Sequence, residues 1–147
     1  MTSCDNDDTN EETELIIHPG QGINNLKIGD LGERVEAELG DGFAVIMNGV
    51  SNPTYNYFHD NKGIDIVFGQ QNSPDLDINT LPIQRFFLYE NFEGMTEEGI
   101  QIGSTRTEVV DTYGDPDQEN TFSSDYNIGI RFIYDMDVVS DIYIEEL

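Results

Sequence analysis

The sequence is poor in cysteine, in basic side chains and in long apolar runs. Of its 147 residues, one is cysteine, none is tryptophan, and six are lysine or arginine against 30 aspartate or glutamate. A single cysteine, Cys4, excludes an intramolecular disulfide and a zinc site built from cysteines. No run of 18 apolar residues occurs, so the sequence predicts no transmembrane helix.

The shortage of basic residues restricts the classes of partner. The formal net charge is −24 at pH 7, and few groups are present to displace counterions from nucleic-acid phosphates. An anionic bilayer surface would also repel the chain. Nucleic acid and unaided membrane binding are therefore excluded, which leaves a basic protein as the charge-complementary partner.

Enough apolar residues remain for one folded domain. Leucine, isoleucine, valine and phenylalanine make up 40 of the 147 residues, above the roughly 20% below which a highly charged chain is expected to be disordered. Residues 5–14 differ, because six are acidic and none is apolar. Like charges at this density keep a chain extended, so we predict an acidic tether over residues 1–14.

The first residues indicate a lipid anchor on Cys4. Thr2 and Ser3 precede this cysteine and an acidic run follows it, an order that resembles the mature end of a bacterial outer-membrane lipoprotein whose signal peptide has been removed. Met1 is then a replacement start, and the acidic run resembles a signal for exposure at the cell surface. The sequence predicts a cell-envelope lipoprotein, and the alternative is a lone thiol in a polar tail.

A segment of the chain recurs 74 residues further along. Residues 26–41 align with residues 100–115, and five of the sixteen positions are identical. In each copy a glycine precedes a short helical pattern, with apolar or aromatic residues spaced four apart on one face. Gly40 and Gly114 are expected to end the two helices, because glycine tolerates the left-handed conformation found there.

Both predicted helices carry capping residues at their start. Asp30 and Glu33 have the spacing of a capping box, and Thr105 and Glu108 repeat it in the second copy. Strand patterns follow each helix. The predicted strands are residues 15–17, 55–58, 64–68, 84–92, 122–127, 128–134 and 138–144, with turns at 59–63 and 135–137, while residues 43–47 fit either a strand or a helical turn.

These patterns predict an α+β fold of two helix-plus-antiparallel-sheet repeats, with the helices packed on one face of the sheet. Repeat 1 is expected over residues 15–93 and repeat 2 over residues 94–147, together forming one compact unit.

Two segments of the second copy carry a further likeness. They are residues 102–116, with a Gly-Asp-Pro stop, and Val138-Val139-Ser140-Asp141-Ile142. They resemble the repeat shared by the SmpA/OmlA (BamE-like) outer-membrane lipoproteins and the β-lactamase inhibitory protein.

This resemblance covers residues 18–147, more closely in the second copy than in the first. It implies a sheet covered by helices on one side, with the other face or the hairpin tips free to contact a protein. The turn of residues 59–62 corresponds by position to such a tip, although it does not match the inhibitory protein's contact motif. The candidate partner contacts are His59, Asp60, Asn61, Lys62, Asp75 and Asp77.

No catalytic constellation stands out in the sequence. Cys4 lies in the tether, no Gly-x-Ser-x-Gly occurs, and the histidines His18 and His59 both fall in predicted turns, where a solvated or backbone-bonded histidine is ordinary. Beyond the tether, three Asp-x-Asp runs begin at residues 75, 115 and 135, but none has the glycine and glutamate of an EF-hand. We interpret them as turn residues and predict no metal, no cofactor and no catalytic residue.

The aromatic stretch of residues 85–89 is apolar on both faces of a strand. Core packing explains one face, and the other is either a second packing surface or a contact patch; we favour internal packing.

The leading functional hypothesis is a lipid-anchored, noncatalytic protein-binding module. The alternative hypothesis is an acidic inhibitor or immunity protein that blocks a basic enzyme or toxin. A third hypothesis is an enzyme that uses surface carboxylates with a metal.

Overall fold

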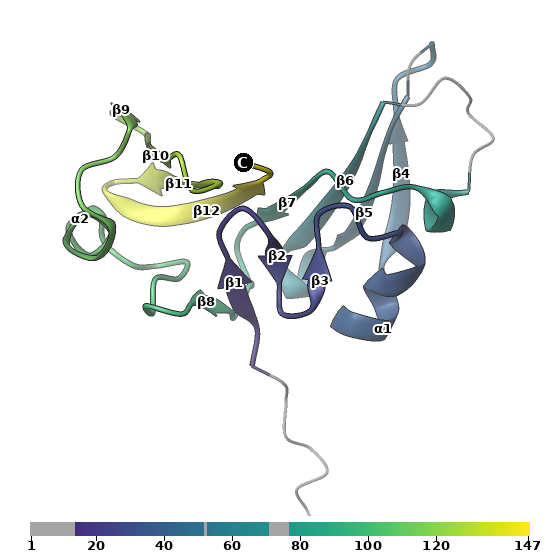
Figure 1. Ribbon diagram of the computed structural model, residues 1–147, viewed down its shortest axis with the longest axis horizontal. Helices are drawn as coiled ribbons and strands as arrows, with labels where there is room; N and C mark the ends of the chain where they lie inside the picture. Colours follow the sequence, from purple (N-terminus) through teal and green to yellow (C-terminus); the bar gives the residue numbers. More distant parts are fainter. Residues whose placement is uncertain (1–13, 52, 71–76) are drawn as a thin grey trace, which may run out of the picture.

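The computed structural model describes residues 14–51, 53–70 and 77–147. Over this part of the chain the protein is mostly β, with an eight-stranded sheet, a four-stranded sheet and two short α-helices (Figure 1). In chain order the elements are β1 (Ile16–His18), β2 (Gly22–Ile23), β3 (Leu26–Lys27), the 3₁₀ turn η2 (Gly32–Arg34), α1 (Val35–Leu39), β4 (Ala44–Asn48), β5 (Thr54–His59), η3 (Asp60–Lys62), β6 (Ile64–Gln70), η4 (Ile78–Thr80), β7 (Arg85–Leu88), β8 (Met95–Thr96), α2 (Arg106–Tyr113), β9 (Gln118–Asn120), β10 (Ser123–Tyr126), β11 (Ile130–Asp135) and β12 (Val138–Glu145).

The larger sheet consists of two four-stranded antiparallel meanders joined edge to edge. Its order is β4-β5-β6-β7-β12-β11-β10-β9, so every pair except one is formed by strands consecutive in the chain. The exception is the antiparallel pair β7–β12, in which Leu88 lies opposite Ile142 and Phe86 opposite Ile144. This single pairing unites strands more than fifty residues apart.

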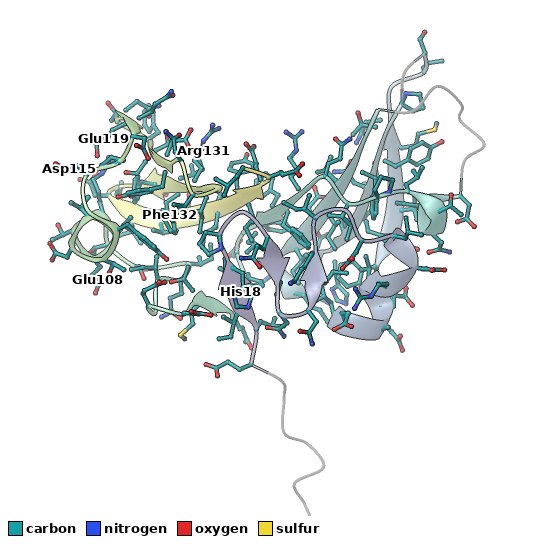
Figure 2. The ribbon with its side chains drawn as sticks, in the orientation of Figure 1. His18, Glu108, Asp115, Glu119, Arg131 and Phe132 are labelled. Atoms are coloured by element: carbon teal, nitrogen blue, oxygen red, sulfur yellow. The ribbon has the colours of Figure 1, made fainter. Side chains whose placement is uncertain are left out.

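One face of the larger sheet carries the hydrophobic core. Phe68 of β6, Phe86 of β7 and Phe132 of β11 are fully buried on it. The backbone of η2 at Gly32 lies against the Phe68 ring, and that of β2 at Gly22 lies against the Phe86 ring. At the other end, Tyr113 of α2 packs against Phe132 with 5.7 Å between ring centroids. Helical turns and the small sheet β3-β2-β1-β8 therefore share this face (Figures 1 and 2).

The predicted α+β fold of two helix-plus-sheet repeats is wrong. The protein is mostly β, α1 has five residues and α2 has eight, and much of the core face is covered by the small sheet instead of by helices. Strands of two or three residues are too short to show a period, so the sequence pattern did not reveal this sheet. Of residues 43–47, left open above, residues 44–47 belong to β4. The division of the chain at residue 93 stays a prediction.

One of the two predicted capping boxes forms. The backbone N–H of Glu108 donates to Thr105 Oγ1 over 3.1 Å, and that of Thr105 donates to Glu108 Oε2 over 2.8 Å. The box at Asp30 is wrong, because the first helical segment begins with a 3₁₀ turn after Leu31 and has no side-chain cap. Asp30 instead accepts a hydrogen bond from the Arg34 guanidinium over 2.7 Å.

Several predicted ends and turns are confirmed. Both helices end at the predicted glycines, Gly40 and Gly114, whose φ angles are +91° and +81°. Their ψ angles are extended, so the chain leaves each helix directly toward the sheet instead of continuing a left-handed turn. The tight turn between β11 and β12 has positive φ at Met136 and Asp137. In β11, which overlaps the predicted strand at residues 128–134, Ile130, Phe132 and Tyr134 all face the core.

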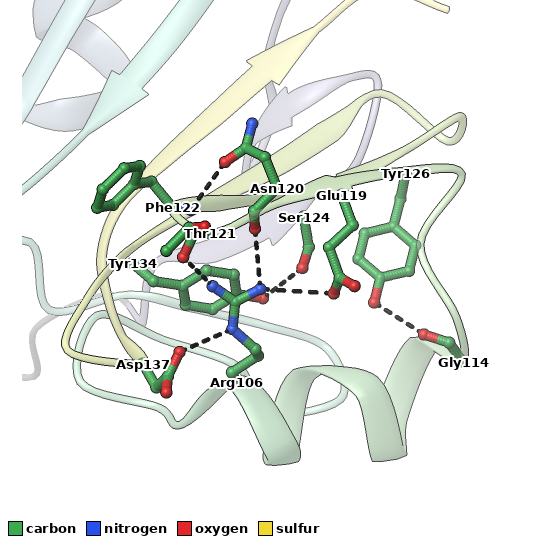
Figure 3. A network of polar contacts seen from close by, with 10 residues as sticks. All are labelled: Arg106, Gly114, Glu119, Asn120, Thr121, Phe122, Ser124, Tyr126, Tyr134 and Asp137. Carbon is green, nitrogen blue, oxygen red and sulfur yellow. Dashed lines mark hydrogen bonds and ion pairs between the residues drawn. The ribbon is translucent and has the colours of Figure 1, made fainter.

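A network around Arg106 fastens α2 to the outer strands of the sheet (Figure 3). The Arg106 guanidinium lies 4.1 Å from the centroid of the Tyr134 ring. It donates from Nε to Asp137 Oδ1 over 3.0 Å, and its other nitrogens donate to Glu119 and to the carbonyl oxygens of Asn120 and Thr121. The planar arginine fork can satisfy this many acceptors at once, so one half-buried cation organises one end of the sheet.

The junction between the two meanders should dominate the stability of the fold. Ile142→Ala removes a fully buried side chain opposite Leu88 and should lower the free energy of unfolding by about 2–5 kcal/mol, because it leaves a cavity. Urea denaturation monitored by tyrosine fluorescence measures this loss. Val50→Ala is the control, since Val50 is 90% exposed and its change should stay within about 0.5 kcal/mol. Equal losses in the two variants would contradict the assigned junction.

Candidate functional site

The predicted contact turn, residues 59–62, is built into the fold. Lys62 donates from Nζ to the carbonyl oxygen of Leu39 over 2.6 Å, at the end of α1. The His59 ring packs edge-on against Phe43, with 5.4 Å between centroids. These contacts hold the turn against the α1 segment, so it is not a free-standing hairpin tip.

Asp60 and Asn61 complete this turn. Asp60 accepts a hydrogen bond from the Tyr89 hydroxyl over 3.0 Å, and its carbonyl oxygen accepts another from Asn91 Nδ2 over 3.2 Å. Burial, together with the hydrogen bond to Asp60, raises the pKa of Tyr89 to about 12. Asn61 is exposed. Asp60 is thus a fixed carboxylate at the junction of β5, β6 and the end of β7.

The other predicted contacts lie elsewhere. Asp77 caps η4, where its Oδ1 accepts from the backbone N–H of Asn79 over 3.0 Å, and η4 lies against Gly32. The 59–62 turn lies at the opposite end of the helical segment 32–39, so the structure does not join Asp77 to it. Asp75 and Cys4 lie outside the described residues.

The acidic turns and the remaining histidine make structural contacts. Asp117 accepts from the backbone N–H of Asn127 over 2.7 Å, and Asp137 binds Arg106. His18 Nδ1 lies 3.4 Å from Glu97 Oε1. Within residues 14–51, 53–70 and 77–147, no group of three histidine, cysteine, aspartate or glutamate side chains is placed to hold a metal ion. In the same residues, no helix is long and apolar enough to cross a membrane.

The few basic residues are largely engaged within the protein. Arg34 binds Asp30 and Glu38 over 2.7 and 2.8 Å, Arg131 binds Asp125 over 2.8 Å, and Arg106 holds the network described above. Exposed acids remain, including Glu108, Asp115 and Glu119 around α2 (Figure 2). The outer surface is therefore strongly acidic, with little internal compensation.

The face of the larger sheet opposite the core carries a continuous row of half-buried side chains. Cross-strand pairing places one residue from each of six neighbouring strands in this row: Phe58, Asp65, Phe87, Tyr143, Arg131 and Asp125. We call this surface the open face. Phe87 and Tyr143 are in contact, with 4.4 Å between their ring centroids. A row held at partial exposure is unlike a core, and its aromatic and arginine side chains are of types enriched in protein contact surfaces.

A hollow of about 580 Å³ lies in the open face over strands β4 to β7 and β12. Aromatic rings of Phe58, Phe87 and Tyr89 line it, together with the carboxylates of Asp60, Asp65 and Asp141. The favoured prediction that this side of residues 85–89 packs internally is therefore corrected. Phe86 and Leu88 are buried in the core, whereas Phe87 and Tyr89 are half-buried and face the hollow.

Asp65 is a half-buried carboxylate of the hollow. Burial raises its pKa, and the nearby Asp60 adds to the increase, while the hydrogen bond from Asn56 and the charge of Arg85 lower it. Asn56 Nδ2 donates to Asp65 Oδ1 over 2.8 Å. Asn56 Oδ1 is buried and has no hydrogen-bond partner within the described part of the chain. Folding thus holds a charge and an unpaired acceptor in the floor of this hollow.

The sequence contains one signal for this site. Asp65 is the only charged residue between Ile64 and Phe68, and Asn56 stands between Tyr55 and Tyr57. A polar residue at alternate positions of an otherwise apolar strand marks the face that is not core.

The chain shows no match to any family model, curated protein or solved structure. The resemblance to the SmpA/OmlA and inhibitory-protein repeat therefore stays a prediction.

We predict that Asp65→Asn stabilises the folded protein. A carboxyl whose folded-state pKa is raised favours folding only when protonated, so its contribution is lost as pH rises through that pKa. Asparagine retains an acceptor for Asn56 without the charge, and Tm at pH 7 should rise. The gain should vanish near about pH 3, where carboxyls are protonated in both states.

Asp135→Asn is the matched control for this comparison, because Asp135 is exposed in the β11–β12 turn and the charge change is identical. Calorimetry of both variants at the two pH values separates local desolvation from general relief of acidic repulsion. A fall in Tm for Asp65→Asn, or an equal rise in both variants, would show that Asp65 carries no special burial penalty.

Proposed function

We propose that this chain is a noncatalytic protein-binding module whose basic partner docks on the open face of the eight-stranded sheet. The observation that carries the proposal is the half-buried row across six strands, with its hollow of aromatic rings and carboxylates. Aromatic side chains dominate the energetics of many interfaces because they bury large areas with few rotatable bonds.

Charge supports the choice of partner. With a formal net charge of −24, the protein repels acidic molecules and accelerates encounter with basic ones. The carboxylates of the hollow would meet complementary groups at the centre of such an interface. A noncatalytic role agrees with the histidine positions, since His18 pairs with Glu97, His59 packs on Phe43, and neither lines the hollow.

The proposal includes anchoring of the module in the cell envelope through a lipid on Cys4, with residues 5–14 as an acidic tether. It rests on the Thr-Ser-Cys order and the acidic residues that follow. Intact-mass spectrometry of the protein isolated from its native host should show a diacyl or triacyl addition, located on Cys4 by peptide fragmentation. Soluble protein with an unmodified Cys4 thiol would contradict the anchor and leave the binding proposal standing.

The binding role is tested by a pair of phenylalanine substitutions. Phe87→Ala removes a ring from the open face, whereas Phe122→Ala removes one that is 69% exposed at the far end of the sheet. We expect the first to weaken binding of a captured, purified basic protein by about tenfold or more, as truncation of a central aromatic anchor does. Titration calorimetry should show the second unchanged. Equal affinities, with both variants folded, would exclude the open face.

The alternative of an acidic inhibitor or immunity protein uses the same surface and differs in the partner. If the chain is an inhibitor, its electrostatic association with the basic partner should weaken as the salt concentration rises. The purified partner should then be an enzyme or toxin whose activity falls when this chain is added. A partner that remains bound at high salt and belongs to an envelope assembly favours the anchored module. The identity and activity of the partner distinguish the two roles.

A further inference from the structure

The hollow in the open face is chemically one-sided. Three carboxylates line it, those of Asp60, Asp65 and Asp141, and none of its lining residues is a lysine, arginine or histidine. Arg85 lies on the same face of β7 and its charge reaches Asp65, but its side chain does not line the hollow. Carboxylates accept hydrogen bonds and cannot donate them when ionised, so the hollow suits a cationic, donor-rich group.

We propose that this hollow is an arginine pocket, which receives the guanidinium of one arginine side chain on the basic partner. The inference rests on the proposed function and specifies what its interface recognises. A guanidinium is planar, always charged, weakly hydrated and rich in donors, so it stacks on aromatic rings while it binds carboxylates. The Phe87 and Tyr89 rings meet edge to face at 5.7 Å and form an aromatic wall beside Asp60 and Asp65.

The protein already binds one of its own arginines in this way. The Arg106 guanidinium lies 4.1 Å from the centre of the Tyr134 ring while its Nε donates to Asp137 over 3.0 Å (Figure 3). The hollow presents the same combination of ring and carboxylate without an arginine from this chain. An ammonium would gain less, because it is a compact, strongly hydrated charge that cannot form the planar fork.

Asn56 adds a second feature that a guanidinium would satisfy. Its Nδ2 is committed to Asp65, and its buried Oδ1 has no partner within the described residues. Because Asn56 lines the hollow, an entering N–H of the ligand is the group that could satisfy this acceptor. Burial also raises the pKa of Asp65, and a cation at hydrogen-bond distance would lower it by stabilising the ionised form.

The test uses acetyl-arginine methylamide as the probe and ¹⁵N-labelled protein at constant ionic strength. We expect saturable chemical-shift changes confined to the backbone of Phe58, Asp65 and Phe87 and to the Asn56 side-chain amide. The uncharged isostere acetyl-citrulline methylamide should give none, and the lysine analogue should bind more weakly. Asp65→Asn should reduce the affinity for the arginine probe about tenfold, because it removes a charge-assisted bond, whereas the matched Asp135→Asn should leave it unchanged.

Several results would overturn the pocket. These are shifts that never saturate, equal shifts with citrulline, shifts spread over acidic turns such as residues 135–137, or equal affinities in the Asp65 and Asp135 variants. Because Asp65→Asn is expected to raise Tm, a loss of binding in that variant cannot be explained by unfolding. A negative result here together with a Phe87→Ala effect on partner affinity would remove the arginine pocket and retain the open face as the docking surface.

Discussion

The pairing of β7 with β12 is the contact on which the rest of the structure depends. It joins two meanders that are each formed by strands consecutive in the chain. On one side it places Phe86 and Leu88 beside Ile144 and Ile142 in the core, and on the other it brings the Phe87 and Tyr143 rings to 4.4 Å. The same backbone register therefore builds the core and the proposed contact surface. A shift of one residue would exchange the two sets of side chains.

The scarcity of basic residues explains much of the local chemistry. Because the sequence has six basic residues for thirty acidic ones, each arginine that forms ion pairs fixes a large part of the structure around it. Arg106 fastens α2, Arg34 binds two acids along the first helical segment, and Arg131 pairs with Asp125 on the open face. Most other acids in the described part of the chain are exposed, and three line the hollow. Self-repulsion among them opposes folding, and a basic partner would relieve it.

Local sequence patterns predicted most of the strands and two of the turns, because alternation and turn chemistry act over a few residues. The β10–β12 meander, the Thr105–Glu108 capping box and the helix ends at Gly40 and Gly114 were all predictable in this way. The small sheet was not, since pairs such as Gly22–Ile23 carry no periodic signal. The α+β prediction failed because repeated four-residue spacing suggested more helix than five and eight residues provide.

The candidate site was less predictable, because it depends on which strands become neighbours. Phe87 was expected inside the protein, and only the register with Asp65 and Tyr143 places it on the open face. The predicted turn contributes Asp60 to the hollow, whereas His59 and Lys62 hold the fold together and Asp77 caps a distant turn. Asp65 is a candidate because it lies half-buried between two aromatic strands, β5 and β7.

Site-specific photo-cross-linking in the native host tests the central claim most directly. A benzophenone amino acid in place of Tyr143 samples the open face, and one in place of Gln101, which is exposed on the covering side, is the control. We predict that the cross-linker at position 143 forms an adduct with a basic protein and that the one at position 101 does not. An arginine-containing peptide of the partner should lie at the cross-link. An adduct from position 101 with none from position 143 would contradict this prediction.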